Sequence, residues 1–248
     1  MTSFPLTPVA FSGEPRAVPP DAPFTWLHQG WALFAAAPGQ WVAMTVLLLV
    51  VFLGLQLVPV IGGLVAALLA PTFVAGLLHA ARRLGDEGRC ELDDLFAGFR
   101  NNAGALVVLG LLFMAGWAAI LLVVAVVAGS GVVGGVAAGV IGQPAMGVGI
   151  GLAGFFLAFV LKLLLGIPLC LAMWLAPALV YCNGMAPVAA LQASFSASLM
   201  SWPAMLVLAL VSLALGFFAL LPMGLGFLVL VPVLAGVLHA AHRDIFLG

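Results

Sequence analysis

The chain has 248 residues, of which 65 % are hydrophobic and only 6 % are charged, and its formal net charge is −1. Soluble domains carry about 25 % charged residues, so the composition excludes a water-soluble globular protein. The near-neutral charge also gives no reason to expect nucleic acid as a partner.

The first 22 residues are rich in proline and lack both the basic start and the apolar centre of a signal peptide. Such a composition favours disorder over a packed structure. We therefore predict an uncleaved, disordered cytoplasmic tail over residues 1–22, followed by a transmembrane domain over residues 23–248.

Several later segments are long and apolar enough to cross a bilayer, whose hydrocarbon core of about 30 Å needs about 20 helical residues. Residues 106–181 form the longest such region, and Lys162 is its single charged side chain. The sequence predicts an all-α, multi-pass transmembrane helical bundle. We predict about six crossings, at residues 41–58, 64–81, 105–128, 152–181, 203–221 and 227–241.

Three shorter segments, at residues 24–37, 91–100 and 187–199, repeat apolar side chains at the spacing of one helical face. Polar side chains lie off that face, and in the second segment Asp93 and Asp94 are expected to face water. This pattern is typical of amphipathic helices at a membrane surface. The predicted apolar faces are Phe24, Leu27, Trp31 and Phe34; Leu92, Leu95, Phe96 and Phe99; and Val188, Leu191, Phe195 and Leu199.

The order of an amphipathic helix, a crossing and a proline-bearing crossing occurs three times, which indicates an internal repeat of the kind found in many membrane folds. The spacing from Phe34 to Pro71 equals that from Phe195 to Pro232, and the pattern Gly-x-x-His-Ala-Ala-x-Arg recurs at Gly76 and Gly236. We expect Pro71 to superpose on Pro232 and His79 on His239. The middle unit, which ends with Pro177, is longer than the other two.

The extra length of the middle unit brackets a glycine-rich stretch at residues 129–151, which fits a loop, a long helical hairpin or two more crossings. Two more crossings would need a turn near residue 123, whereas the first turn signals come only at Gly129 and later. We therefore predict six crossings. The surplus should then be an apolar hairpin or loop with its tip near Gln143-Pro144. Small-x3-small spacing in this stretch allows close contact between helices or subunits, whereas a flexible outer loop is the alternative. The glycines at that spacing are Gly131, Gly135, Gly139, Gly147 and Gly151.

The basic residues decide the predicted orientation. All except Lys162 fall on one side of the membrane if both termini are cytoplasmic, as the positive-inside rule requires. The three amphipathic helices then lie on the inner leaflet. The residues concerned are Arg16, Arg82, Arg83, Arg89, Arg100 and Arg243.

Three groups of motifs carry a resemblance to a known family. The motifs are Gly30-Trp31-Ala32-Leu33-Phe34 with Pro38 and Trp41; Leu95-Phe96-Ala97-Gly98-Phe99; and Ala176-Pro177-Ala178-Leu179-Val180 with Ala190-Leu191 and Ser194-Phe195. They are similar to those of an uncharacterised family of proteobacterial six-helix inner-membrane proteins and, more distantly, to the membrane domain fused to some glycerophosphodiesterases. The resemblance implies a bacterial inner-membrane location and six crossings, and it implies no activity.

Few polar residues are candidates for a function. Lys162 either extends its amine to the outer boundary, which costs little, or is buried and serves an ion or a substrate. His79 and His239, with His242, sit near the cytoplasmic ends of the second and sixth crossings, where a metal site or proton relay competes with an ordinary headgroup-zone location. Cys90, Cys170 and Cys182 show no metal-finger spacing, and we expect no disulfide.

The sequence contains no paired nucleophile and base, no phosphate-binding loop and no membrane-buried pair of carboxylates. We therefore predict no enzyme and no catalytic, cofactor or metal site. The favoured hypothesis is a structural, assembly or partner-binding role, with the lipid bilayer and an oligomer formed through the Gly-rich helix faces as partners. The alternative is a small transporter or lipid-handling protein, which a cavity lined by Lys162, Gln143 or Gln56 would favour.

Overall fold

A computed structural model describes residues 15–247, in which there are nine α-helices, one 3-10 helix and no strand. The all-α prediction is therefore confirmed. The elements are α1 (Ala22–Ala36), α2 (Pro38–Gln56), α3 (Ile61–Glu87), the 3-10 helix η1 (Leu92–Phe96), α4 (Ala97–Arg100), α5 (Ala103–Val140), α6 (Pro144–Asn183), α7 (Pro187–Met200), α8 (Trp202–Leu220) and α9 (Phe227–Phe246).

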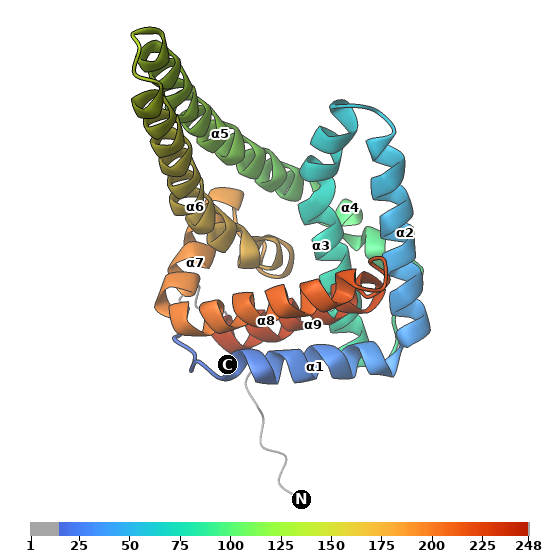
Figure 1. Cartoon of the computed structure of the whole chain (residues 1–248). Helices are drawn as coiled ribbons and strands as arrows, with labels where there is room; N and C mark the ends of the chain where they lie inside the picture. The colour runs from blue at the N-terminus through green and yellow to red at the C-terminus, as the bar shows by residue number, and fades with distance from the viewer. Residues whose placement is uncertain (1–14, 248) are drawn as a thin grey trace, which may run out of the picture.

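Six helices in the described part of the chain are long and apolar enough to cross a membrane: α2, α3, α5, α6, α8 and α9. These helices correspond to the six predicted crossings. Consecutive helices form three hairpins, α2–α3, α5–α6 and α8–α9 (Figure 1). Four of these helices end further on than predicted: α5 continues to Val140 instead of 128, and α6 to Asn183 instead of 181. Helix α3 continues to Glu87 and ends where Gly88 adopts a φ of 72°, and α9 continues to Phe246.

The glycine-rich stretch forms the outer end of a long helical hairpin made by α5 and α6, which have 38 and 40 residues. We call this hairpin the arm; it projects away from the other helices in Figure 1. Its turn lies at residues 141–143, next to the predicted tip. A Cβ on Gly131 would lie 2.7 Å from the Gly154 Cα, and a Cβ on Gly135 would lie 2.6 Å from the Gly147 carbonyl oxygen. The interpretation as a flexible loop was thus wrong, because these glycines let the two helices touch.

The second helices of the three hairpins, α3, α6 and α9, contact one another and form the centre of the molecule. Their shared core contains side chains with no exposed surface, among them Leu78, Leu175, Leu179, Val237 and Ala241. These are the three proline-bearing helices of the predicted repeat. The three repeat units therefore contact one another through their equivalent proline-bearing helices.

Each amphipathic segment packs against the proline-bearing helix of a different repeat unit, and runs antiparallel to it. Helix α1 packs on α9, the η1–α4 segment packs on α3, and α7 packs on α6. A Cβ on Gly236 would lie 2.6 Å from the Gly30 Cα, and a Cβ on Gly76 would meet the Leu95 carbonyl oxygen. The N-terminal segment, by packing on α9, closes a ring of three similar contacts.

These contacts correct the predicted register of the repeat. Pro71 and His79 are eight residues apart, whereas Pro232 and His239 are seven apart. Along continuous helices, therefore, the prolines and the histidines cannot both superpose. Gly76 and Gly236 make the equivalent backbone contacts, so the glycine and histidine positions define the common frame and the prolines are offset by one residue.

The buried faces of the amphipathic helices also differ from the prediction. In α1, Phe24 and Trp31 are exposed while Trp26 and Gly30 are buried. In α7, Val188 and Leu199 are exposed while Ser194 is fully buried. Close helix contact selects small or hydrogen-bonding side chains, and the apolar stripe that periodicity identifies is only partly buried, with Leu27, Phe34 and Leu191 against the core.

The last part of the predicted disordered tail is packed. The Arg16 backbone N–H donates to the Ile245 carbonyl (3.0 Å), and the Val18 N–H donates to Ser201 Oγ (3.2 Å). The prediction of disorder to residue 22 is therefore corrected for residues 15–22, which contact Ile245 of α9 and Ser201 and end in the first residue of α1. The rest of that prediction concerns residues 1–14, which lie outside the described part.

Candidate functional site

Polar side chains from all three core helices gather where these helices end. The Tyr181 hydroxyl of α6 lies 3.1 Å from His79 Nδ1 of α3, and His242 Nε2 of α9 lies 2.8 Å from Asn183 Oδ1 of α6. These two contacts connect α3, α6 and α9 in series. We call this region the polar end; it consists of His79, Arg82, Arg83, Tyr181, Asn183, His239, His242 and Arg243, together with Asp94 of η1, which contacts His79 and Arg83.

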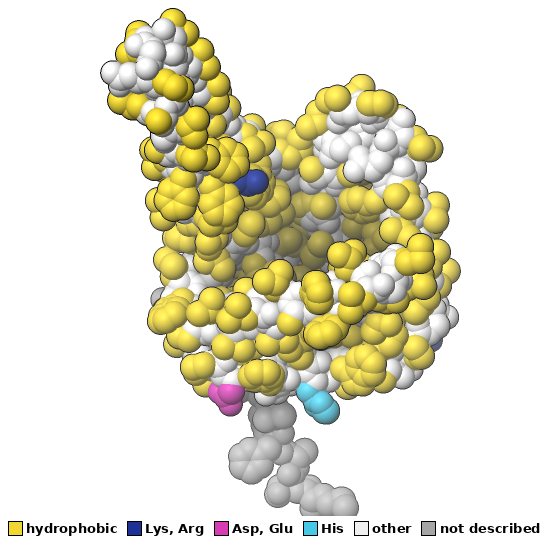
Figure 2. Space-filling view, viewed as in Figure 1, with side chains coloured by type: hydrophobic (Ala, Val, Ile, Leu, Met, Phe, Trp, Pro, Cys, Tyr) yellow, Lys and Arg dark blue, Asp and Glu magenta, His cyan; other side chains and the backbone are white. Residues whose placement is uncertain are grey.

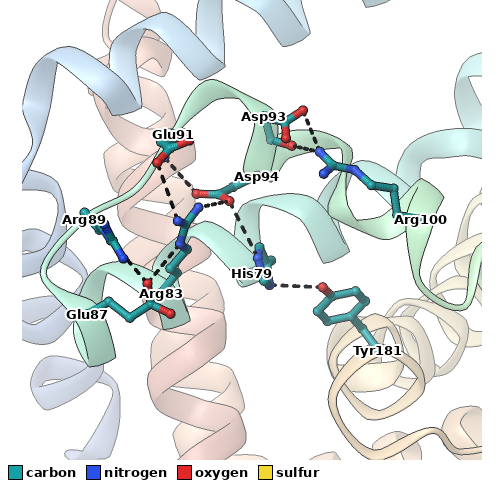
Figure 3. A network of polar contacts seen from close by, with 9 residues as sticks. All are labelled: His79, Arg83, Glu87, Arg89, Glu91, Asp93, Asp94, Arg100 and Tyr181. Carbon is teal, nitrogen blue, oxygen red and sulfur yellow. Dashed lines mark hydrogen bonds and ion pairs between the residues drawn. The ribbon is translucent and has the colours of Figure 1, made fainter.

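Asp94, on η1, is the buried carboxylate of the polar end, with 5 % of its surface exposed. It accepts hydrogen bonds from Arg83 Nη1 (2.8 Å) and from the Glu91 N–H (2.8 Å), and its Oδ1 lies 3.6 Å from His79 Nε2. Figure 3 shows the resulting series Asp94, His79, Tyr181. The expectation that Asp94 faces water was wrong. Residues 92–96 form a 3-10 turn, in which side chains do not follow the α-helical spacing, and this turn folds back onto α3.

The other ion pairs in Figure 3 are more exposed. Arg83 also contacts Glu87 (3.2 Å) and Glu91 (3.5 Å). Arg100 and Asp93 form a separate pair at 2.6 Å, with both side chains more than half exposed. Exposed pairs of this kind contribute little to stability. Asp94 is therefore the member of the cluster that we expect to contribute most to stability.

Cys90, beside this cluster, is a buried thiol. Burial raises its pKa above the ordinary value, and the nearby carboxylate of Asp94 acts in the same direction. Less of the thiolate is therefore present at neutral pH, and the thiolate is the reactive form. Cys90 is an inert structural residue by this criterion.

Two cavities open at the polar end. The smaller, of about 300 Å³, is lined by His79, Tyr181 and Asn101 together with the charged end of α3. The larger, of about 860 Å³, lies between α1, the end of α3 and α9. Its polar lining includes Thr25, Gln29, His239 and Arg243. His79 and His239 thus line different cavities.

Helix α6 bends between its outer part and the end that carries Tyr181 and Asn183, and Figure 1 shows the change of direction. Ser194 Oγ of α7 accepts the Leu175 N–H (3.1 Å) and donates to the Leu171 carbonyl (2.9 Å). These two backbone groups are i and i−4 partners in an α-helix. A side chain inserted between such partners is a known cause of kinks, as is an internal proline, and α6 contains Pro168 and Pro177.

Lys162 lies far from the polar end. It is an exposed residue of α6, about 29 Å along the helix axis from Tyr181 at 1.5 Å per residue. No ion pair of Lys162 occurs in the described part of the chain. Gln56 and Gln143 are exposed as well. The structure therefore does not bring Lys162 together with His79 or His239.

Sequence reasoning missed three partners at this site: Asp94, Tyr181 and Asn183. Two of them carried a usable signal. Tyr181 is the single tyrosine of the chain, and it ends the core helix of the middle repeat. Glu91 and Asp94 have the three-residue spacing of a capping box, which the structure contains. No group of three or more His, Cys, Asp or Glu suited to a metal occurs in the described part.

Comparison of the chain with protein-family models, with curated proteins and with solved structures finds no match.

Proposed function

We propose that the protein is a non-enzymatic integral protein of the bacterial inner membrane with an assembly role, and that its arm associates with the arm of a second copy. The resemblance of its motifs to an inner-membrane family supports the location, and the arginine distribution supports cytoplasmic termini. The assembly role rests on one observation, which is the length of the apolar arm.

The arm is too long for one bilayer. A helix of 38 residues is about 57 Å long, whereas the hydrocarbon core is about 30 Å thick. Even a tilt of about 40°, the upper end of the usual range, leaves the helix spanning about 44 Å. The outer part of the arm has no charged residue, and its face in Figure 2 shows hydrophobic side chains with uncharged backbone and other groups between them. Such a surface needs a cover other than water.

The outer arm carries both a groove and the knobs that fit one. The groove, of about 360 Å³, is lined by glycines, including Gly135, Gly139 and Gly147, with valine side chains beside them. Val132 and Val136 are 60 % and 63 % exposed. A two-fold dimer needs one self-complementary surface on both subunits. Two copies in one membrane share an orientation, so a two-fold axis along the membrane normal presents groove to groove.

The alternative of a transporter gains no comparable support. None of the three cavities described above is lined by Lys162, Gln143 or Gln56. The largest of them opens at the polar end, away from the arm.

Crosslinking at adjacent positions tests the dimer. In a background of C90S, C170S and C182S, V132C lines the groove, whereas V133C lies on the next face and is 70 % exposed. We expect mild oxidation in membranes to give a crosslinked dimer with V132C and not with V133C. Adding Gly139→Leu should fill the groove and reduce the dimer about tenfold; its Cβ meets no atom within 4 Å in the same chain.

Equal crosslinking at both positions would show random collision and remove the proposal. A V132C crosslink to another protein, with no crosslink between two copies, would reject the second copy as the occupant.

A further inference from the structure

We propose that the larger cavity of the polar end, between α1, α3 and α9, binds the phosphate group of a phospholipid headgroup. This inference is independent of the dimer proposed above, because the cavity lies at the opposite end of α6 from the tip of the arm.

One cationic side chain at this cavity has no ion-pair partner in the described part of the chain. Asp244 is paired with Arg16 Nη2 at 2.6 Å and also accepts the Trp26 Nε1–H at 3.0 Å. Asp86, near the cavity, pairs with Arg82 at 3.7 Å. Arg243 lines the cavity and forms no ion pair in the described part of the chain. The surplus charge at the cavity is therefore positive, which favours an anion.

Neutral hydrogen-bonding groups complete the lining. Thr25 and Gln29 lie one helical turn apart on α1, and both line the cavity together with His239 of α9. No side-chain hydrogen bond of these three groups occurs in the described part. A guanidinium beside a hydroxyl, an amide and an imidazole offers a phosphate several donors at once, and charge-assisted bonds of this kind are the strong ones.

A lipid suits the surroundings better than a soluble phosphate compound. Phe24 and Trp31 lie on a different, outward face of α1 and are 58 % and 54 % exposed. Exposed aromatic side chains are favoured at the headgroup level of a bilayer. A cavity of about 860 Å³ has room for a headgroup, and its apolar lining, which includes Ala32, Leu33 and Leu247, can contact the glycerol and upper acyl region.

Lipid binding to the purified full-length protein tests the proposal. Native mass spectrometry would titrate phosphatidylglycerol against wild type, Arg243→Gln and the charge-matched control Arg89→Gln, which alters an exposed arginine outside the cavity. Diacylglycerol serves as the probe without phosphate. We expect wild type and R89Q to prefer phosphatidylglycerol over diacylglycerol, and R243Q to lose about tenfold in affinity.

Two further measurements separate the possible outcomes. Gln29→Ala keeps every charge and should weaken binding about threefold, which covers the case that R243Q fails to fold. Inorganic phosphate, compared with chloride at matched ionic strength, tests the soluble source. Thermal stabilisation by phosphate that needs Arg243, without lipid selectivity, would keep the phosphate site and reject the lipid. Equal effects of R243Q and R89Q, or no dependence on Arg243 for either probe, would overturn the proposal.

Discussion

At the scale of single residues, Asp94 is the one buried residue among those drawn in Figure 3, and it contacts three of the others. It holds the start of η1 through the Glu91 N–H and positions Arg83, and it lies next to His79. Its neighbour Asp93 has the same chemistry on an exposed face. The two residues therefore separate the effect of burial from the effect of charge.

The predicted consequence is a large difference between Asp94→Ala and Asp93→Ala. We expect D94A to lower the free energy of unfolding by about 2 kcal/mol, because hydrogen bonds to a buried carboxylate are lost. D93A should leave it unchanged within error, since its ion pair is exposed. Titration with a denaturing detergent measures both. If D93A and D94A behave alike, Asp94 is not the anchor of η1.

At the scale of elements, the fold depends on places where a helix backbone touches another backbone. Gly76 meets η1 at Leu95, Gly30 and Gly236 meet between α1 and α9, and the glycines of the arm meet each other. In the third repeat contact, Ser194 replaces backbone approach with hydrogen bonds into α6. Small residues at helix crossings are the common device of membrane proteins, because dispersion contacts replace the hydrophobic effect between helices.

A pair of Gly→Ala substitutions tests this account. We expect Gly76→Ala to destabilise the protein by about 3 kcal/mol, because its new methyl group overlaps the Leu95 backbone and neither side can move freely. Gly216→Ala in α8, where a Cβ meets nothing within 4 Å, should be neutral or stabilising by about 0.5 kcal/mol. The same unfolding titration compares them. A G76A variant as stable as G216A would contradict the close approach.

At the scale of the whole molecule, three hairpins meet at a core formed by their second helices, and only the middle hairpin extends far beyond this core (Figure 1). The arginines lie near the ends of the core helices, while the turn of the arm lies at Gly142 and Gln143. With both termini inside, the tip of the arm faces the periplasm.

Labelling with a membrane-impermeant maleimide tests this orientation in the background without native cysteines. Gln143→Cys should react in intact cells and Arg89→Cys only after the membrane is opened, because these positions lie on opposite sides of the bilayer. Reaction of Q143C from the cytoplasmic side alone would reverse the orientation.

The sequence by itself determined the class of the protein and its six apolar helices, because a bilayer accepts only long uncharged segments whose backbone groups bond internally. It also placed the turn of the arm near Gln143, since Gly-Gln-Pro stands out from its apolar surroundings. The repeated Gly-x-x-His pattern indicated which helices are equivalent.

Only the tertiary structure decided which faces meet. Lipid and protein neighbours are equally apolar, so the pattern of α1 or α7 does not say which side packs and which side stays outside. The burial of Asp94 depends on a short 3-10 turn folding back on α3, and the helical state of residues 129–151 depends on glycine contacts across the arm. Both are contacts between residues distant in the chain, and local periodicity carries no information about them.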